Sequence, residues 1–197
     1  MRFRRGFTLI EVLIAATVSL LVLGATYRLF VHGARLYARG QARAELQASG
    51  LVALDRMSRE LRHSAASTLT VLPSQPGAAT RVDGALSFRL PADLESVVAF
   101  SPSSSYIIYF RDRYRNTLVR KTSPASAPGR LDVDELERLC GTADEAEQLV
   151  ATGVEAFLLG VATPDTVSLE LQLGAELDST TRVQETVNTS LCFRNRL

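Results

Sequence analysis

Large apolar residues follow one another almost without interruption over residues 7–27, and Glu11 is the one charged residue among them. A helix needs about 20 such residues to cross the hydrocarbon core of a bilayer. The pattern therefore predicts a membrane-spanning helix close to the N-terminus. A carboxylate inside such a helix costs about 2.5–3.5 kcal/mol on insertion scales, so we expect Glu11 to have a partner and a function.

The helical pattern continues beyond the apolar segment. No proline occurs over residues 7–63, and good helix formers such as Ala, Leu, Arg and Glu dominate. In the second half, apolar residues recur mostly at multiples of three or four, which indicates one buried face. These residues are Leu46, Leu51, Leu54, Met57 and Leu61. We expect one continuous helix that spans the membrane with its inner half and packs onto a globular domain with its outer half.

The hydrophobic period changes after the helix, and short β-branched or alternating segments follow. Tyr106, Ile108 and Phe110 alternate with Ile107 and Tyr109, so the two sets should face opposite sides of a sheet, as core rather than as an exposed adhesive patch. Strands are predicted at 69–72, 86–90, 106–110, 117–121, 154–159, 167–173 and 183–193, with a short apolar run at 97–100, a hairpin turn at 112–116 and an acidic helix-prone segment at 131–149. This order predicts an α+β fold with a mainly antiparallel sheet packed on the outer half of the helix.

Composition and charge narrow the possible functions. The net charge of +1 argues against a strongly basic nucleic-acid binder, and the absence of tryptophan excludes a stacking platform built on that residue. His32 and His63 are the only histidines, and no catalytic triad, phosphate-binding loop or Cys-x-x-Cys pattern occurs. We therefore predict that the chain is not an enzyme and holds no cofactor.

Two charged clusters are candidate binding sites. Asp132, Asp134 and Glu135 offer oxygen ligands for Ca²⁺, but the glycine and distal glutamate of an EF-hand loop are not in register, so a solvated helix face is favoured and no metal site is predicted. Arg35, Arg39 and Arg43 share one helix face. A solvated face is favoured there over pairing with acidic filament neighbours, lipid headgroups or DNA phosphates.

The N-terminal segment resembles a known motif. Gly6-Phe7-Thr8-Leu9-Ile10-Glu11-Val12-Leu13 follows Arg2, Arg4 and Arg5, and it is similar to the prepilin-type cleavage and methylation motif of type IV pilins and type II secretion pseudopilins. The resemblance implies that a prepilin peptidase cuts after Gly6 and methylates the amino group of Phe7, and that Glu11 supports filament assembly. It also implies a pilin-like fold with a leader at 1–6, a transmembrane half-helix at 7–30, an outer amphipathic half-helix at 31–65 and a β-rich domain at 66–197.

The order of the segments resembles PilW-type minor pilins and J-type pseudopilins. This likeness implies a single-pass inner-membrane subunit, with a cytoplasmic N-terminus and an exported domain, that joins a pilus or pseudopilus. Its partners would be other pilins or pseudopilins, the prepilin peptidase, the assembly platform and membrane lipid. The alternatives are a pseudopilin of a secretion or competence system and, from another class, a signal-anchored periplasmic binding module; a tethered enzyme is the weakest.

Two cysteines, Cys140 and Cys192, fall in the part that the resemblance places outside the cytoplasm. An even count in an oxidising compartment predicts one disulfide between them, with two buried free thiols as the alternative.

The cleavage site generates a first prediction. Gly6→Val should block processing, because recognition at this junction needs a small residue, whereas the unchanged chain should yield a mature protein that begins at Phe7. N-terminal sequencing of the membrane-extracted protein measures this. An unchanged chain that still begins at Met1 would contradict every filament-forming interpretation.

Overall fold

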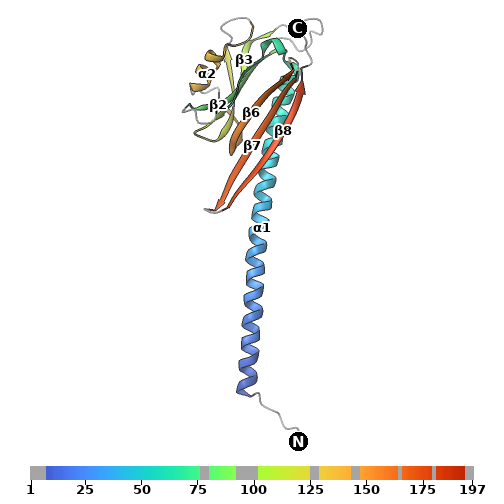
Figure 1. Ribbon diagram of the computed structural model, residues 1–197, viewed down its shortest axis with the longest axis vertical. Coiled ribbons are helices and arrows are strands. Elements are labelled where there is room, and N and C mark those ends of the chain that lie inside the picture. Colours follow the sequence, from blue (N-terminus) through green and yellow to red (C-terminus); the bar gives the residue numbers. More distant parts are fainter. Residues whose placement is uncertain are drawn as a thin grey trace. The chain divides into compact units, whose positions relative to one another are not determined.

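The computed structural model describes residues 8–75, 80–91, 102–124, 129–142, 147–163, 166–178 and 181–193. The chain divides into two compact units, one ending at Gln41 and the other beginning at Ala42. The second unit contains the last part of the long helix and all the described strands (Figure 1).

The long helix α1 (Leu9–His63) confirms the prediction of one uninterrupted helix. It ends where Ser64 folds back on it, because the Ser64 N–H and hydroxyl both donate to the Leu61 carbonyl oxygen, at 3.0 and 2.7 Å. These bonds satisfy a carbonyl that the helix leaves without a partner at its C-terminus.

The remaining elements build two sheets (Figure 1). One has the strand order β1-β2-β3-β4-β5 and the other β6-β7-β8. All the described pairings are antiparallel, so the structure has the predicted α+β layout of a pilin-like fold. The elements after α1 are η1 (Ala66–Thr68), β1 (Thr70–Leu72), β2 (Val82–Pro91), β3 (Pro102–Asp112), β4 (Thr117–Pro124), α2 (Val133–Gly141), β5 (Glu147–Thr152), β6 (Val154–Thr163), β7 (Thr166–Asp178) and β8 (Thr181–Cys192).

The β3–β4 hairpin confirms the predicted strands, turn and alternation. Asp112 pairs with Thr117, and the Asp112 Oδ1 atom accepts the Tyr114 N–H at 3.0 Å inside the turn. Both faces of β3 are buried: one set of side chains (Tyr106, Ile108, Phe110) packs in the smaller core beside α2, and the other (Ile107, Tyr109) packs in the main core. The aromatic cluster is therefore core, as predicted.

The outer half of α1 contributes one face to the main core. Leu46, Leu54, Met57 and Leu61 are buried there as predicted, but Leu51 is 51% exposed. Gly50 takes the place that Leu51 was expected to hold. A Cβ atom on Gly50 would lie 2.9 Å from a methyl group of Leu173, so a larger residue would require the Leu173 side chain to shift where the helix meets β7.

A second departure concerns the acidic segment. Its helix α2 ends at Gly141, and Glu147 and Leu149 belong to strand β5, which the sequence did not predict. The end of α2 is held by Lys121, whose buried Nζ atom donates to the carbonyl oxygens of Leu139 and Thr142, at 2.9 and 2.7 Å. A cation at this end also complements the helix dipole. The short apolar run at 97–100 lies outside the described residues.

Buried polar groups fasten α1 to the five-stranded sheet. The Tyr109 hydroxyl donates to Glu60 Oε2 at 3.0 Å, and Arg120 Nε donates to Glu60 Oε1 at 3.1 Å. Burial raises the pKa of Tyr109, and the Glu60 carboxylate raises it further, so the phenol stays protonated as a donor.

The two sheets meet at a tight joint. Arg111 Nε on β3 donates to the Val154 carbonyl oxygen at the start of β6, at 2.8 Å. Gly84 on β2 has φ +83°, and a Cβ atom there would lie 2.5 Å from the Phe157 carbonyl oxygen on β6. Position 84 therefore combines a backbone conformation that favours glycine with a backbone contact that leaves no room for a side chain.

Gly84→Ala should lower the free energy of unfolding by about 3 kcal/mol or more, because it adds a clash with backbone to the cost of a left-handed conformation. Gly129→Ala is the matched control, since Gly129 also has positive φ (+102°) but has no atom within 4 Å of an added Cβ. The control should lose only about 1–2 kcal/mol. Urea denaturation of the chain in detergent measures both variants, and equal losses would contradict the steric account.

Candidate functional site

The N-terminal motif is the candidate site. Gly6 and Phe7, the residues of the predicted cleavage and methylation site, lie outside the described residues. Thr8 and Glu11 are described, and Glu11 stands in the first turn of α1. The part of the site that the structure describes is therefore the helix start that follows the predicted cut.

Thr8 and Glu11 form a reciprocal cap at this helix start. The Thr8 N–H donates to Glu11 Oε2 at 2.9 Å, and the Thr8 hydroxyl donates to the same oxygen at 3.0 Å. In return, the Glu11 N–H donates to Thr8 Oγ1 at 3.4 Å, and the Val12 N–H donates to the Thr8 carbonyl oxygen at 3.3 Å. This is a capping box, in which a Thr at the N-cap and a Glu three residues later satisfy each other's backbone donors.

The cap provides Glu11 with hydrogen-bond donors from its own chain. The sequence alone indicated a carboxylate left poorly compensated in a lone subunit, but Thr8 supplies two hydrogen bonds from within the same turn. Both bonds reach Oε2. A carboxylate has about four acceptor positions, so Glu11 can accept further donors while the cap is in place. The site can therefore stabilise the helix start and receive a cation together.

The segment after the cap is apolar on all sides. Within the described residues, α1 is the one helix long and apolar enough to cross a membrane, and none of its most apolar stretch is buried. Large side chains such as Leu13, Val18, Leu21 and Leu23 are all more than half exposed. A helix that is apolar all round requires a non-aqueous environment.

Cys140 and Cys192 are free cysteines in the structure, so it does not support the predicted disulfide. Cys140 is buried on α2 beside the five-stranded sheet, where burial raises its pKa to about 12 and keeps it as an unreactive thiol. Cys192 is exposed at the end of β8 in the other sheet, with its sulfur 3.2 Å from Thr166 Oγ1. Cys140 therefore lies on a helix beside the five-stranded sheet and Cys192 on a strand of the three-stranded sheet, which sequence spacing could not reveal.

The acidic and basic clusters weighed from the sequence lie at the start of α2 and on α1. Among the described residues, no group of three or more His, Cys, Asp or Glu side chains could hold a metal ion. Asp132, Asp134 and Glu135 stand at the start of α2. Arg43, the last member of the basic stripe, donates from Nε to Glu185 Oε2 on β8 at 2.7 Å, so it pairs within its own unit rather than facing solvent alone.

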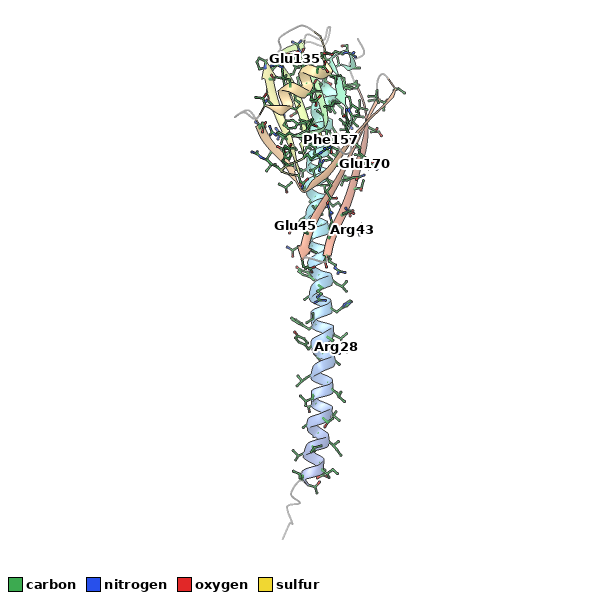
Figure 2. All side chains as sticks on the ribbon, turned by 60° about the vertical axis from the view of Figure 1, so that its left-hand side comes forward. Arg28, Arg43, Glu45, Glu135, Phe157 and Glu170 are labelled. Carbon is green, nitrogen blue, oxygen red and sulfur yellow. The ribbon has the colours of Figure 1, made fainter. Side chains whose placement is uncertain are left out.

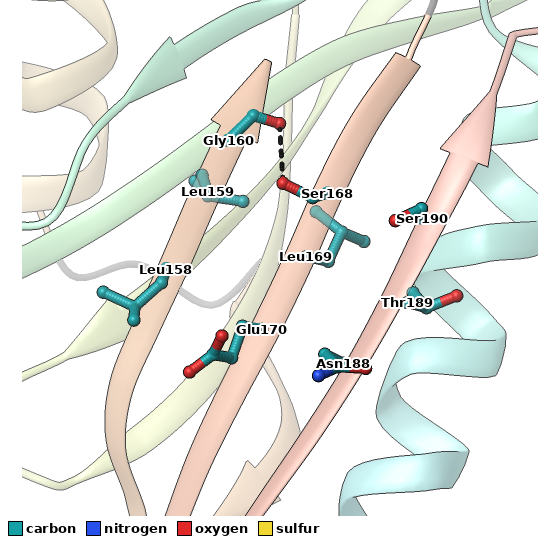
Figure 3. Close-up of a pocket in the computed structure, with 9 residues that line it drawn as sticks. All are labelled: Leu158, Leu159, Gly160, Ser168, Leu169, Glu170, Asn188, Thr189 and Ser190. Carbon is teal, nitrogen blue, oxygen red and sulfur yellow. Dashed lines mark hydrogen bonds between the residues drawn. The ribbon is translucent and has the colours of Figure 1, made fainter. Parts of the chain in front are cut away.

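The outer face of the three-stranded sheet has a hollow of about 470 Å³ (Figure 3). The residues that line it are Leu158, Leu159, Gly160, Ser168, Leu169, Glu170, Asn188, Thr189 and Ser190. Glu170 is the one ionisable group among them, and it accepts a hydrogen bond from Gln172 at 3.0 Å. A single carboxylate without a base, nucleophile or metal partner does not make a catalytic set.

Comparison with known proteins found a match to the N-terminal segment. Residues 1–27 match the prokaryotic N-terminal methylation motif, which is characteristic of type IV pilins and pseudopilins. No curated protein and no solved structure is significantly similar to the chain. The match supports a prepilin-type N-terminus like that of type IV pilins and pseudopilins, and the apolar N-terminal helix fits an inner-membrane anchor. Proteins with this motif are generally structural rather than enzymatic.

Sequence reasoning identified Glu11 but missed Thr8. The signal was present, because Thr8-x-x-Glu11 is the spacing of a capping box directly before an apolar run.

Thr8→Val should weaken the helix start, because valine keeps the branched shape of threonine but loses both hydroxyl hydrogen bonds. An N-cap loss of about 1 kcal/mol corresponds to roughly fivefold faster amide exchange in the first turn. Hydrogen exchange of the micelle-bound protein measures it. Thr17→Val is the matched control, since the Thr17 hydroxyl bonds to the Leu13 carbonyl oxygen inside the helix. Unchanged first-turn exchange in Thr8→Val would refute the cap.

Proposed function

We propose that this protein is a minor pilin subunit that is cleaved after Gly6, methylated at Phe7 and incorporated into, or used to prime, a type IV pilus filament. The observation that carries the proposal is Glu11, a carboxylate near the start of an exposed apolar helix and five residues after Gly6. The N-terminal methylation motif over residues 1–27 supports prepilin-type processing.

Charge energetics explain why Glu11 would favour assembly. Cleavage creates an amino group on Phe7, and methylation leaves it able to carry a positive charge. Two opposite charges about 4 Å apart gain about 4 kcal/mol at an effective dielectric constant of 20. This gain is similar to the insertion cost of a carboxylate at the centre of a membrane helix, about 2.5–3.5 kcal/mol. The terminal amine of a neighbouring subunit would therefore stabilise Glu11 beyond what Thr8 provides.

The outer half of α1 also offers a surface for a neighbour. Ala48, Leu51 and Val52 are exposed and lie opposite the face that Leu46 and Met57 bury, by the 100° step of an α-helix. Val52 is 68% exposed. This patch extends the apolar character of the span onto the second unit, as expected of a helix that packs against other helices in a filament.

The partners that follow from this role are other pilins, the prepilin peptidase and the inner-membrane assembly platform. The N-terminus would face the cytoplasm and the second unit the periplasm or the exterior. A pseudopilin of a secretion or competence system would use the same N-terminal chemistry, and no contact in the described structure favours it over a pilus subunit.

Glu11→Ala and Glu11→Gln should both lower incorporation of the subunit into filaments several-fold, because each removes the charge that meets the neighbour's amine. Cleavage, membrane insertion and the fold of the second unit should stay intact. The measurement is the fraction of subunit in sheared filaments, or cross-linked to partner pilins, relative to the unchanged protein.

Glu45→Gln is the matched control, since Glu45 is an exposed carboxylate on the same helix but outside the apolar segment. Its incorporation should equal that of the unchanged protein. Equal incorporation of both Glu11 variants would show that the charge does not recruit this subunit.

A further inference from the structure

Aromatic and basic side chains follow the apolar part of α1 as a collar, here defined as residues 27–39. Tyr27, Phe30 and Tyr37 are each more than two-thirds exposed. Arg28 and Arg35 are exposed between them, Arg39 is exposed just after Tyr37, and Figure 2 marks Arg28 on this part of the helix. No Asp or Glu occurs from residue 12 to residue 44, so the helix supplies no negative charge of its own here.

The basic members of the collar share one helix face. Arg28, His32, Arg35 and Arg39 are separated by four, three and four residues, which places them within about 60° of one another on an α-helix. Like charges four residues apart on one face destabilise an isolated helix. A stripe with this arrangement is favourable where an external negative charge offsets the repulsion.

The depth of each arginine follows from helix geometry. A span that begins near Leu9 reaches the far side of a ~30 Å hydrocarbon core close to Tyr27 and Arg28, at 1.5 Å per residue. Arg35 would lie about 10 Å beyond Arg28, and Arg39 about 6 Å further still. The headgroup region is roughly 5–8 Å thick on each side, and arginine side chains can extend back toward it. Arg28 lies in this region, Arg35 at its outer edge and Arg39 outside it.

We propose that the collar binds anionic phospholipid headgroups at the membrane face where the span ends. The guanidinium groups of Arg28 and Arg35 contact the phosphates, and the rings of Tyr27 and Phe30 occupy the interface, as amphipathic aromatic residues do at bilayer boundaries. The inference requires only that α1 spans the membrane, and it holds for a pilus subunit and a secretion pseudopilin alike.

In the orientation proposed above, the placement of charge gives an additional reason for lipid binding. Arginines close to a membrane span favour the cytoplasmic side, yet this chain carries Arg28, Arg35 and Arg39 on the side opposite Arg2, Arg4 and Arg5. In the proposed orientation the collar is therefore on the disfavoured side. Contact with anionic headgroups offsets this and opposes withdrawal of an unassembled subunit from the bilayer.

The experiment uses the absence of tryptophan from the chain. A Phe30→Trp variant of the full chain carries a single fluorescent reporter inside the collar. It is reconstituted into phosphatidylcholine vesicles that contain graded fractions of brominated phosphatidylglycerol or brominated phosphatidylcholine. Quenching of the tryptophan by each brominated lipid gives the ratio of the two association constants at the collar.

We expect the anionic lipid to be preferred about fivefold or more, since each arginine near an anionic surface contributes roughly a fivefold gain in affinity. Arg28→Gln should lower the preference about fivefold, Arg35→Gln about twofold and Arg39→Gln less than twofold, because the surface potential decays within a Debye length of about 8 Å. High salt should reduce the preference in the same order. Circular dichroism checks that each variant keeps its helix.

Arg59→Gln is the matched control, since Arg59 is an exposed arginine of α1 that lies in the second unit and pairs with Asp55. It should leave the ratio unchanged. A ratio near one for the reporter protein, or equal losses from the three collar variants regardless of depth, would overturn the proposal. Either result would favour an acidic protein surface, rather than lipid, as the partner of the basic face of the collar.

Discussion

The apolar part of α1 must be covered by lipid or by the apolar surfaces of other helices, and the proposed roles of Glu11 and of the collar depend on that constraint. Large side chains surround the helix from Leu9 to Phe30, and none of its most apolar stretch is buried. Burying one such side chain gains about 1.5–3 kcal/mol, so the segment as a whole strongly favours a bilayer or the apolar surfaces of other helices. A chain that can satisfy the same segment in either setting is suited to move from a membrane into an assembly.

In the proposed assembly, Glu11 favours a neighbouring helix over lipid as the environment of α1. Apolar side chains alone do not distinguish lipid from a neighbouring helix, since hydrocarbon tails are as apolar as leucine. In the proposed assembly a carboxylate would distinguish them, because the hydrocarbon core offers it no donor whereas a neighbour's amine would. The hydrogen bonds from Thr8 lower the cost of waiting in the membrane, with both bonds directed to one carboxylate oxygen. The cap and the proposed amine contact are therefore compatible.

Local patterns predicted most of the fold. The absence of proline and the spacing of Leu46, Leu54 and Met57 predicted α1 and its buried face, and the alternation in 106–110 predicted both faces of β3. Features that depend on contacts distant in sequence were not predictable. Gly50 rather than Leu51 faces the core, because β7 approaches the helix at Gly50. Glu147 lies in strand β5, which pairs with the distant strand β4 and places Glu147 opposite Lys121. In the candidate site, Glu11 was evident as an isolated charge, whereas the separation of Cys140 and Cys192 depends on which sheet each element joins.

The central claim is that Glu11 meets the terminal amine of another subunit. A membrane-permeant carbodiimide applied to assembled filaments would join a carboxylate and an amine only where they are in contact, and mass spectrometry of the digested filaments would identify the joined peptides. Isotopic labelling of this subunit alone separates links between chains from links within one chain. The account predicts a peptide in which labelled Glu11 is bonded to the N-terminal amine of an unlabelled subunit. Links confined to Glu11 and Phe7 of the same chain would contradict it.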